Sequence, residues 1–329
     1  MENLEVNFWA GRRIFLTGGT GLVGSWVADA LVQAKAQVTV LVQDVHPMGH
    51  FFGSGTHQHC HIVYGRFEDM DVLERALCIS EAEVVIHLGA QAIVDHALAA
   101  PLLTFESNVR GTYNLLECCR RHAKSIKSIV VASTDKAYGT NEQLPYVEEM
   151  PLKGVHPYDA SKVCTEIIAR SYHETYGLPL ILVRCGNIFG GGDLNFSRLV
   201  PGTIKSLLFD ERPILRSDGT FVRDYVYVKN VARVYLSLAQ LLYNGKASGE
   251  AFNYSDDNPL TVMAVVEAIA RCLKKTKLKP VILNQAKHEI HDQHLSCAKL
   301  RKFVQLDGLA DFEASLDETI RWYREFFRR

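Results

Sequence analysis

The chain has 329 residues, enough to bury the core of one large α/β domain with a smaller companion. Lysine and arginine total 36 against 37 for aspartate and glutamate, without a long run of either sign, so neither nucleic acid nor a charged membrane is expected as a partner. No segment is apolar over the length of a bilayer, and the first residues lack the pattern of a secretion signal. We therefore expect a cytoplasmic protein that acts on a small molecule.

Eight cysteines stand mostly in apolar or helical contexts, with no Cys-x-x-Cys pair and no zinc-type spacing of cysteine and histidine. Reduced, buried thiols are therefore expected. His57, His59 and His61 alternate in a polar segment, which is more typical of a solvated turn than of metal ligands with supporting partners. The sequence predicts no metal site.

A strand, a glycine-rich turn and a helix open the predicted fold. Residues 13–17 form a β-branched and aromatic run that leads directly into Gly18, and the apolar residues that follow recur with helical spacing. Gly18, Gly21 and Gly24 allow a tight turn, close approach of the backbone to a pyrophosphate, and close packing of the helix on the sheet. The helix N-terminus adds free N–H groups and a partial positive charge. This arrangement predicts a dinucleotide-binding site.

Asp44 follows the second predicted strand, residues 37–42, and stands about 20 residues past the glycine loop. An acidic side chain at this place accepts hydrogen bonds from the adenosine ribose and repels a 2′-phosphate, so NAD is favoured over NADP. The alternative is a solvated aspartate in a turn.

Two further predicted strands end in the same half of the chain. Residues 61–64 lead into the segment 65–69, which we expect to flank the adenine. Residues 84–88 lead into the segment 89–91, which we expect beside the nicotinamide ribose. These strand ends extend the predicted cofactor site beyond the glycine loop.

The central stretch 133–162 carries the candidate catalytic residues. An apolar run, residues 129–132, ends in a cluster of polar side chains, and strand ends of open parallel sheets are where ligands bind. A tyrosine then precedes a lysine by four residues, so the two share one face of a helix. The five residues that we expect to line one cleft are Thr134, Asp135, Lys136, Tyr158 and Lys162.

The alternation of strands and helices loosens after the predicted strand 180–183. We expect an NAD-binding domain over residues 1–185, to which the chain returns around 222–250, and a smaller substrate-binding domain over residues 186–329. Arg198, Arg216 and Arg223 are spaced along this second region, where three guanidinium groups could hold a diphosphate bidentately.

These features together resemble the extended short-chain dehydrogenase/reductases that act on nucleotide sugars. The motifs that carry the resemblance are Thr17-Gly18-x-x-Gly21-x-x-Gly24, His87-Leu88-x-Ala90-Gln91, Asn108 with Gly111-Thr112, Tyr158-x-x-x-Lys162, Arg184-x-Gly186-Asn187 and Val222-Arg223-Asp224-Tyr225-x-Tyr227-Val228. The resemblance implies an α/β fold, a Rossmann-type doubly wound parallel sheet with a smaller, mixed α/β C-terminal substrate domain. It also implies that Asn187 and Arg223 contact the phosphates of a nucleoside-diphosphate sugar, beside Arg198 and Arg216, which are expected there from their spacing.

The resemblance implies a cofactor site for NAD built from the glycine loop, the strand ends and the catalytic pair. Its expected residues are Gly18, Thr20, Gly21, Leu22, Val23, Gly24, Asp44, Arg66, Phe67, Leu88, Gly89, Ala90, Gln91, Asn108, Ser133, Tyr158 and Lys162.

Within that family the chain is most similar to CDP-glucose 4,6-dehydratases. The shared features are Phe8-Trp9-x-Gly11-Arg12-Arg13, Gly24-Ser25-Trp26, Asp135-Lys136, Gly190-Gly191-Gly192-Asp193 and Arg198-x-Val200-Pro201. The chain departs from those enzymes in a short segment after Tyr138 and in Arg223-Asp224-Tyr225, which follows the general epimerase pattern. Arg66 also stands where an adenine-contacting aspartate is usual. These departures bear on the nucleotide more than on the reaction.

The expected reaction begins with oxidation at C4 of the sugar, for which Tyr158 would take the hydroxyl proton. A free tyrosine titrates near 10, so a pKa lower by about 3 would need roughly 4 kcal/mol of phenolate stabilisation. Lys162 and a positive nicotinamide ring would supply it, and Thr134 would relay a proton. Asp135 as acid to the C6 oxygen and Lys136 as base at C5 would then eliminate water.

Three functions are compatible with the sequence. A 4,6-dehydratase of the CDP-glucose type needs Asp135 and Lys136, whose alternative role is to pair with each other or to cap a loop. A nucleotide-sugar 4-epimerase like UDP-glucose 4-epimerase would use the tyrosine and lysine alone. A non-catalytic NAD-sensing protein would need neither. The resemblance also implies a homodimer through the helices around Val109 and Tyr158, with a tetramer as the alternative.

Overall fold

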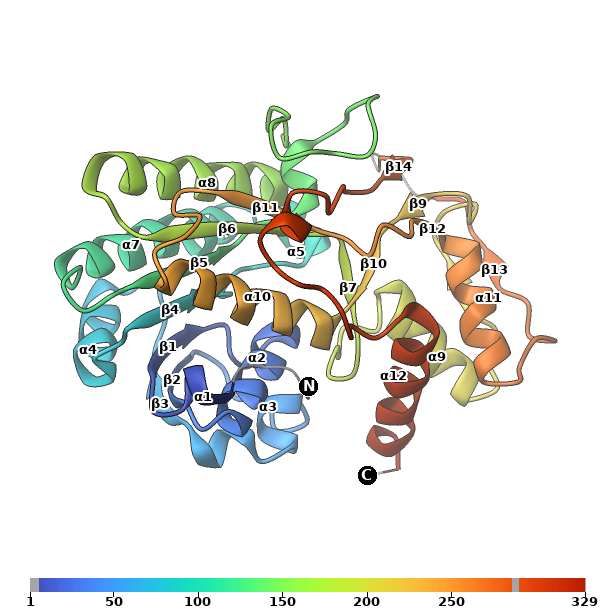
Figure 1. The fold of residues 1–329 in the computed structure, drawn as a ribbon. Coiled ribbons are helices and arrows are strands. Elements are labelled where there is room, and N and C mark those ends of the chain that lie inside the picture. Colours follow the sequence, from blue (N-terminus) through green and yellow to red (C-terminus); the bar gives the residue numbers. More distant parts are fainter. Residues whose placement is uncertain (1–5, 286–289, 329) are drawn as a thin grey trace.

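A seven-stranded parallel sheet organises the chain, of which the computed structural model describes residues 6–285 and 290–328. The strand order across the sheet is β3-β2-β1-β4-β5-β6-β11. Neighbouring strands run parallel throughout (Figure 1). The strands are β1 (Arg13–Thr17), β2 (Gln37–Val42), β3 (His61–Tyr64), β4 (Val84–His87), β5 (Ser128–Ala132), β6 (Leu180–Cys185) and β11 (Ala251–Tyr254).

The central strands are apolar because both faces of the sheet are covered. Ile14 and Leu16 of β1 point into one apolar cluster, and Phe15 between them points into a second cluster on the other face. A parallel sheet buried in this way selects continuous β-branched and aromatic runs. The predicted strands at 13–17, 37–42 and 61–64 are confirmed with these bounds.

Helices cover both faces, which confirms the predicted doubly wound arrangement. The first apolar cluster lies between the sheet and α2 (Leu22–Gln33) with α10 (Val228–Tyr243). The second lies under α4 (Met70–Ser80), α7 (Gly111–Arg121) and α8 (Pro157–Tyr176). Figure 1 shows α7 and α8 on the opposite side of the sheet from α10. The remaining N-terminal helices are α1 (Val6–Trp9), α3 (His50–Gly53), α5 (Val94–Ala99) and α6 (Pro101–Phe105), with short turns η1 (Thr56–His59), η2 (Glu106–Arg110) and η3 (Asp135–Tyr138).

The chain crosses between two halves more than once. After β6 it leaves the large sheet, and α10 and β11 then bring it back, β11 pairing with β6 as the seventh strand. This return falls close to the expected segment 222–250, although β11 ends at Tyr254. The division of the chain at residue 185 into two domains stays a prediction.

The C-terminal half combines small sheets with three helices and lies at the right of Figure 1. Its strands are β7 (Asn187–Phe189), β8 (Ile214–Leu215), β9 (Val222–Arg223), β10 (Tyr225–Tyr227), β12 (Leu260–Thr261), β13 (Val281–Ile282) and β14 (Asp292–Gln293). Its helices are α9 (Leu199–Leu208), α11 (Val262–Cys272), α12 (Phe312–Phe326) and the turn η4 (Leu300–Lys302). Within the described residues, no helix combines the length and apolar character needed to cross a membrane.

Candidate active site

The glycine loop joins β1 to α2 in a turn that tolerates no side chain at two of its glycines. Gly18 has φ +73°, the left-handed region that favours glycine. A Cβ on Gly24 would lie 2.1 Å from the carbonyl oxygen of Gly18. Gly21 precedes α2 without a side-chain cap, so the first N–H groups of this 12-residue helix are free to bind an anion. Thr20, Leu22 and Val23 complete the loop. The cradle fits the pyrophosphate of a dinucleotide.

The adenine end of the predicted cofactor site shows one difference from expectation. Asp44 is exposed after β2, where it accepts a hydrogen bond from Gln43 (3.1 Å), and Arg66 is exposed and pairs with Glu68 (3.2 Å). Phe67, however, is buried and packs edge-on against His87, with ring centroids 5.5 Å apart. The phenyl ring belongs to the core, so a contact between Phe67 and the cofactor would come from its backbone.

A buried hydrogen-bonded chain fixes the end of β4 against the glycine loop. Thr17 Oγ1 lies 2.7 Å from His87 Nδ1, and His87 Nε2 lies 3.2 Å from Thr112 Oγ1. Because the Thr112 hydroxyl donates to the Asn108 carbonyl, it accepts from Nε2–H of His87. Burial lowers the pKa of His87 to about 3, which keeps the ring neutral. Leu88, Gly89 and Ala90 follow, and Gly89 N–H donates to Thr17 Oγ1 (3.1 Å).

Asn108 is fully occupied by protein partners. Its side-chain oxygen accepts from Gln91 N–H (2.7 Å), and its amide donates to the Gln91 carbonyl (3.0 Å) and to Ser161 Oγ (2.8 Å). The single wide turn η2 places the residue for these contacts. Asn108 therefore ties the β4 strand end to α8, and its contact with the cofactor stays a prediction.

Tyr158 and Lys162 share one face of α8 as predicted. Burial, however, shifts the pKa of each side chain toward its neutral form, whereas a lowered tyrosine pKa was expected. Lys162 Nζ donates to the carbonyl of Ala132 (2.9 Å), and burial lowers its pKa to about 8. Burial raises the pKa of Tyr158 to about 12, against the opposing effect of a hydrogen bond between Tyr158 and Thr134. The expected lowering of the tyrosine pKa is thus not a property of the protein alone.

Asp135 is a buried carboxyl at the end of β5. Its side chain is 4% exposed, and burial raises its pKa against the opposing charge of Lys136. Thr134 donates to Asp135 Oδ1 (3.1 Å) and itself accepts from Lys136 N–H (3.3 Å) to cap η3. The loop cap is therefore Thr134, and burial favours the protonated form of the Asp135 carboxyl.

The arginines predicted to bind diphosphate lie in different surroundings. Arg198 and Arg223 are near enough to lower the pKa of Tyr158 and of Asp135, respectively. Arg223 is buried and donates to the backbone carbonyls of Val222 and His291 (2.8 and 2.7 Å) and also to that of Ile290.

Arg198 also pairs with Asp193 (3.2 Å). Arg216 is 57% exposed and pairs with Asp95 after β4 (3.1 Å). Asn187 on β7 is exposed. Arg198 and Arg223 thus lie within electrostatic reach of Tyr158 and Asp135, respectively, whereas the guanidinium of Arg216 pairs with Asp95 on α5.

Residues 14–254 match a family model described as the NAD dependent epimerase/dehydratase family. The chain belongs to this family. The resemblance expected from the motifs is confirmed, and the glycine cradle fits the NAD that the family description names.

Relatives in this family include CDP-glucose 4,6-dehydratase of Salmonella typhimurium, 28% identical over 341 residues that cover 99% of this chain and 94% of the relative. The dTDP-glucose 4,6-dehydratase of Neisseria meningitidis serogroup B is also 28% identical, over 339 residues that cover 95% of this chain and 93% of the relative.

Solved structures of epimerases and dehydratases match the fold equally well. A UDP-glucose 4-epimerase from Thermotoga maritima, solved with UDP-glucose, superposes with a TM-score of 0.85 at 25% identity, covering 95% of this chain and 99% of that one. A double-mutant dTDP-glucose 4,6-dehydratase from Streptomyces venezuelae, solved with NAD bound, also superposes with a TM-score of 0.85, at 26% identity, covering 95% of this chain and 97% of that one. Overall shape alone does not separate the two reactions.

A buried ion pair that the sequence did not reveal lies within electrostatic reach of Lys162. Arg184 donates from Nε and Nη2 to the two carboxylate oxygens of Glu166 (2.8 and 2.6 Å), and both side chains are almost completely buried. Ser133 donates to the same carboxylate (2.6 Å), so its hydroxyl points to Glu166. A possible signal was the position of Glu166, one helical turn after Lys162.

Two more buried carboxyls escaped prediction. Asp159 follows Tyr158, and burial raises its pKa against the charge of Lys136. Asp224 accepts hydrogen bonds from Leu295 N–H (2.6 Å) and Ser255 Oγ (2.8 Å), and burial raises its pKa to about 7. Asp159 and Asp224 both lie inside motifs of the resemblance, in which roles were predicted only for the neighbouring Tyr158 and Arg223.

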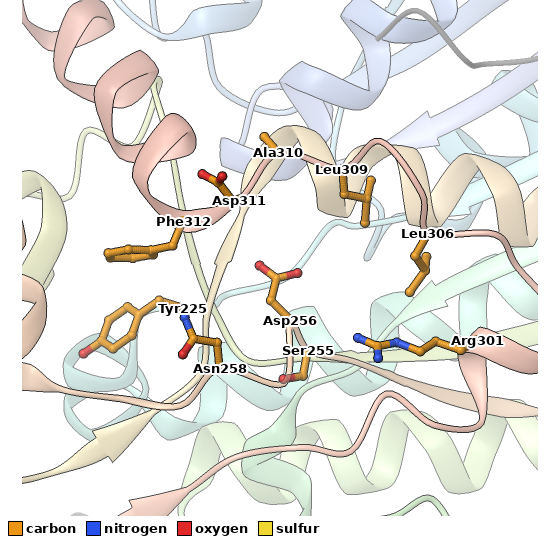
Figure 2. A pocket seen from close by; sticks show the side chains of 10 residues that line it. All are labelled: Tyr225, Ser255, Asp256, Asn258, Arg301, Leu306, Leu309, Ala310, Asp311 and Phe312. Atoms are coloured by element: carbon orange, nitrogen blue, oxygen red, sulfur yellow. The ribbon is translucent and has the colours of Figure 1, made fainter.

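A separate cavity of about 250 Å³ opens in the C-terminal half (Figure 2). Asp256 and Asp311 contribute carboxylates to it, and Arg301 on its edge is paired with Asp257 (2.8 Å). None of its lining residues belongs to the predicted site. Its acidic lining is unsuited to a diphosphate.

Proposed function

We propose that this protein is a nucleoside-diphosphate-hexose 4,6-dehydratase that uses NAD. The observation that carries the proposal is the buried carboxyl of Asp135, with a raised pKa, beside Thr134 and within the electrostatic reach of Tyr158. A carboxyl whose burial favours the protonated form can serve as a general acid, which a dehydratase needs and an epimerase does not.

The first step takes the proton from the C4 hydroxyl of the sugar. NAD, when bound, accepts the hydride from C4 and later returns it to C6. Tyr158 receives the hydroxyl proton, and Thr134, which hydrogen-bonds Tyr158, orients the same hydroxyl. Lys162, held by the Ala132 carbonyl, supplies positive charge on the α8 face beside the tyrosine.

Elimination then removes water across C5 and C6. With a ketone at C4 the C5 proton is acidic. Lys136, as the neutral amine, takes this proton and becomes an ammonium, while Asp135 gives its proton to the departing C6 hydroxyl, which leaves as water. Once charged, Lys136 opposes the effect of burial on the pKa of both Asp135 and Asp159. The product is a 4-keto-6-deoxy sugar.

The nucleotide is held through its diphosphate. Arg223 and Arg198 lie beside the catalytic carboxyl and tyrosine, and Asn187 and Arg216 complete the set of polar side chains assigned to substrate. CDP-glucose is the first substrate to test, because the full-length CDP-glucose 4,6-dehydratase relative shares 28% of its residues with the chain.

Incubation of the protein with CDP-glucose, dTDP-glucose, GDP-mannose and UDP-glucose in deuterated water tests the proposal. We expect at least one sugar to lose water and to carry solvent deuterium at C5. A 4-epimerase is the second candidate, since the UDP-glucose 4-epimerase structure matches the fold as closely as the dehydratase structure does. Inversion at C4 with the C6 hydroxyl retained would establish the epimerase and refute the dehydratase.

We also propose that the chain forms a homodimer through α6, α7 and α8. Leu102 and Leu103 are 71% and 62% exposed on α6, and Ile167 on the neighbouring α8 is 60% exposed. Phe105 and Tyr113 extend the same helical surface. Contiguous exposed apolar side chains of this kind mark interaction surfaces.

A further inference from the structure

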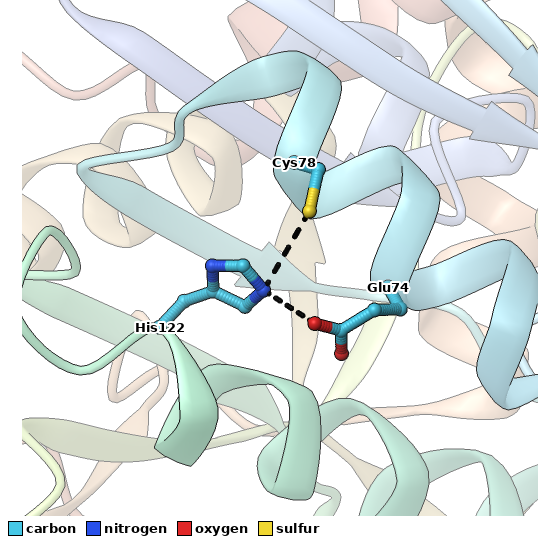
Figure 3. Close-up of side chains that lie close together, drawn as sticks. All are labelled: Glu74, Cys78 and His122. Atoms are coloured by element: carbon cyan, nitrogen blue, oxygen red, sulfur yellow. Dashed lines mark hydrogen bonds and ion pairs between the residues drawn. The ribbon is translucent and has the colours of Figure 1, made fainter.

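Glu74, Cys78 and His122 bring three different metal-ligating atoms together on the surface of the α4–α7 layer (Figure 3). His122 Nε2 lies 2.7 Å from Glu74 Oε1 and 3.9 Å from Cys78 Sγ. All three donor atoms are within 4.8 Å of one another. Figure 3 shows the thiol and the carboxylate directed at the same ring nitrogen from one helix.

Helix geometry explains how the cluster forms. Glu74 and Cys78 are four residues apart on α4, so they share one face, and His122 follows the last residue of α7, which packs on α4. The site belongs to the outer helical layer, and none of its residues takes part in the proposed catalysis. It unites segments more than 40 residues apart, which is why short Cys and His spacings gave no sign of it.

The carboxylate of Glu74 has a free coordination position. His122 Nε2 lies 2.7 Å from its Oε1. Its second oxygen, Oε2, is buried and has no hydrogen bond within the part of the chain that the structure describes, while Arg121 forms a long ion pair with it at 4.0 Å. A buried carboxylate oxygen without a partner is costly, and a cation would satisfy it.

We propose that Glu74, Cys78 and His122 bind a zinc-type divalent cation that clasps α4 to α7. Thiolate, imidazole and carboxylate are the ligands Zn²⁺ takes, at about 2.3, 2.0 and 2.1 Å respectively, which places donor atoms about 3.3–3.6 Å apart in a tetrahedron. The observed separations of 2.7 and 3.9 Å bracket that range, so small side-chain rotations suffice. Water fills the fourth position.

Binding is coupled to proton release. The Cys78 thiol gives its proton to solvent and binds as thiolate, while His122 binds through Nε2 as the neutral ring with its proton on Nδ1. Sulfur as a ligand also selects against Mg²⁺ and Ca²⁺, which prefer oxygen. Cys118, one turn before His122, is left out of the ligand set because it is completely buried and its thiol donates to the Met70 carbonyl (3.9 Å).

Zinc titration of the reduced, full-length protein without an affinity tag tests this site. We expect saturable binding of one Zn²⁺ per chain, and a thiolate-to-metal absorption band when Co²⁺ replaces it. Even outer-shell partners are worth about 10- to 100-fold in metal affinity, so Cys78→Ser and His122→Gln should each weaken binding by at least about 100-fold. Glu74→Gln should weaken binding while leaving the thiolate band in place.

Cys272→Ser is the matched control, because Cys272 Sγ also lies 3.9 Å from a carboxylate, that of Glu313. This variant should bind Zn²⁺ like the parent. Circular dichroism of each variant without metal reports whether the fold is intact. Absence of saturable binding, or equal binding by Cys78→Ser and the parent, would overturn the proposal. So would a loss caused by His57→Gln/His59→Gln with Cys78→Ser unaffected, since the histidine segment would then be the site.

Discussion

Replacement of Asp135 by asparagine separates the two proposed reactions. Asparagine keeps the size of the side chain and an oxygen that can accept the hydrogen bond from Thr134 (3.1 Å), but it carries no transferable proton. Loss of a general acid costs about 10²- to 10⁴-fold, which corresponds to roughly 3–5 kcal/mol of transition-state stabilisation. Oxidation at C4 does not use this proton. We therefore expect Asp135→Asn to oxidise the sugar but to eliminate water at least about 100-fold more slowly.

The assay follows both steps in one experiment with the nucleotide sugar identified by the substrate panel. Absorbance of the reduced nicotinamide reports C4 oxidation, and mass spectrometry in deuterated water reports loss of water and exchange at C5. The thermal midpoint should not fall, because a neutral amide replaces a carboxyl whose ionisation burial disfavours. Asp224→Asn is the control, since it neutralises another buried carboxyl outside the assigned machinery. Elimination within about threefold of the parent would refute the acid role.

Three other variants test the charge, interface and cofactor assignments. Burial raises the pKa of Asp224 from 3.8 to about 7, so the stability that the protonated carboxyl contributes is full below pH 3.8 and is lost as the pH rises to 7. Asp224→Asn should therefore recover up to about 4 kcal/mol of unfolding free energy above pH 7. The thermal midpoint of the variant should rise relative to that of the parent between pH 5 and 8. Leu102→Glu/Leu103→Glu should convert a dimer into a monomer in light scattering, whereas Ile214→Glu, at another exposed apolar position, should not. Gly24→Ala would force a methyl group to 2.1 Å from a backbone oxygen; overpacking costs about 1–3 kcal/mol, so NAD should bind about 5- to 150-fold more weakly by calorimetry.

The large sheet could be predicted from the sequence because its strands bury both faces. The runs at 13–17 and 37–42 are mostly β-branched or apolar, and the glycine loop fixes a strand before it and a helix after it. The short strands after β6 gave weaker signals. β8 and β13 have two residues each and pair with each other across a long separation in sequence, so no local period defines them.

The site was harder to predict where tertiary packing decides the environment of a side chain. Phe67 stood at a strand end like its exposed neighbour Arg66, but its ring turns under Gly89 and Gly111, whose missing side chains leave the space. Asn108 looked like a cofactor contact, and only the fold shows that its amide is used by Gln91 and Ser161. Spacing along the chain indicates which residues meet, but not which are already hydrogen-bonded or desolvated.

Burial at the catalytic edge disfavours the charges that the proposed chemistry requires. The pKa of Tyr158 is about 12 and that of Lys162 about 8. Lowering the pKa of Tyr158 to about 7, where the side chain would act as a base, requires roughly 7 kcal/mol of phenolate stabilisation. Lys162 donates to the Ala132 carbonyl, so much of that stabilisation has to come from positive charge brought by the bound cofactor. Tyr158 is therefore expected to remain a neutral phenol until the site is filled, which confines proton removal to the complex.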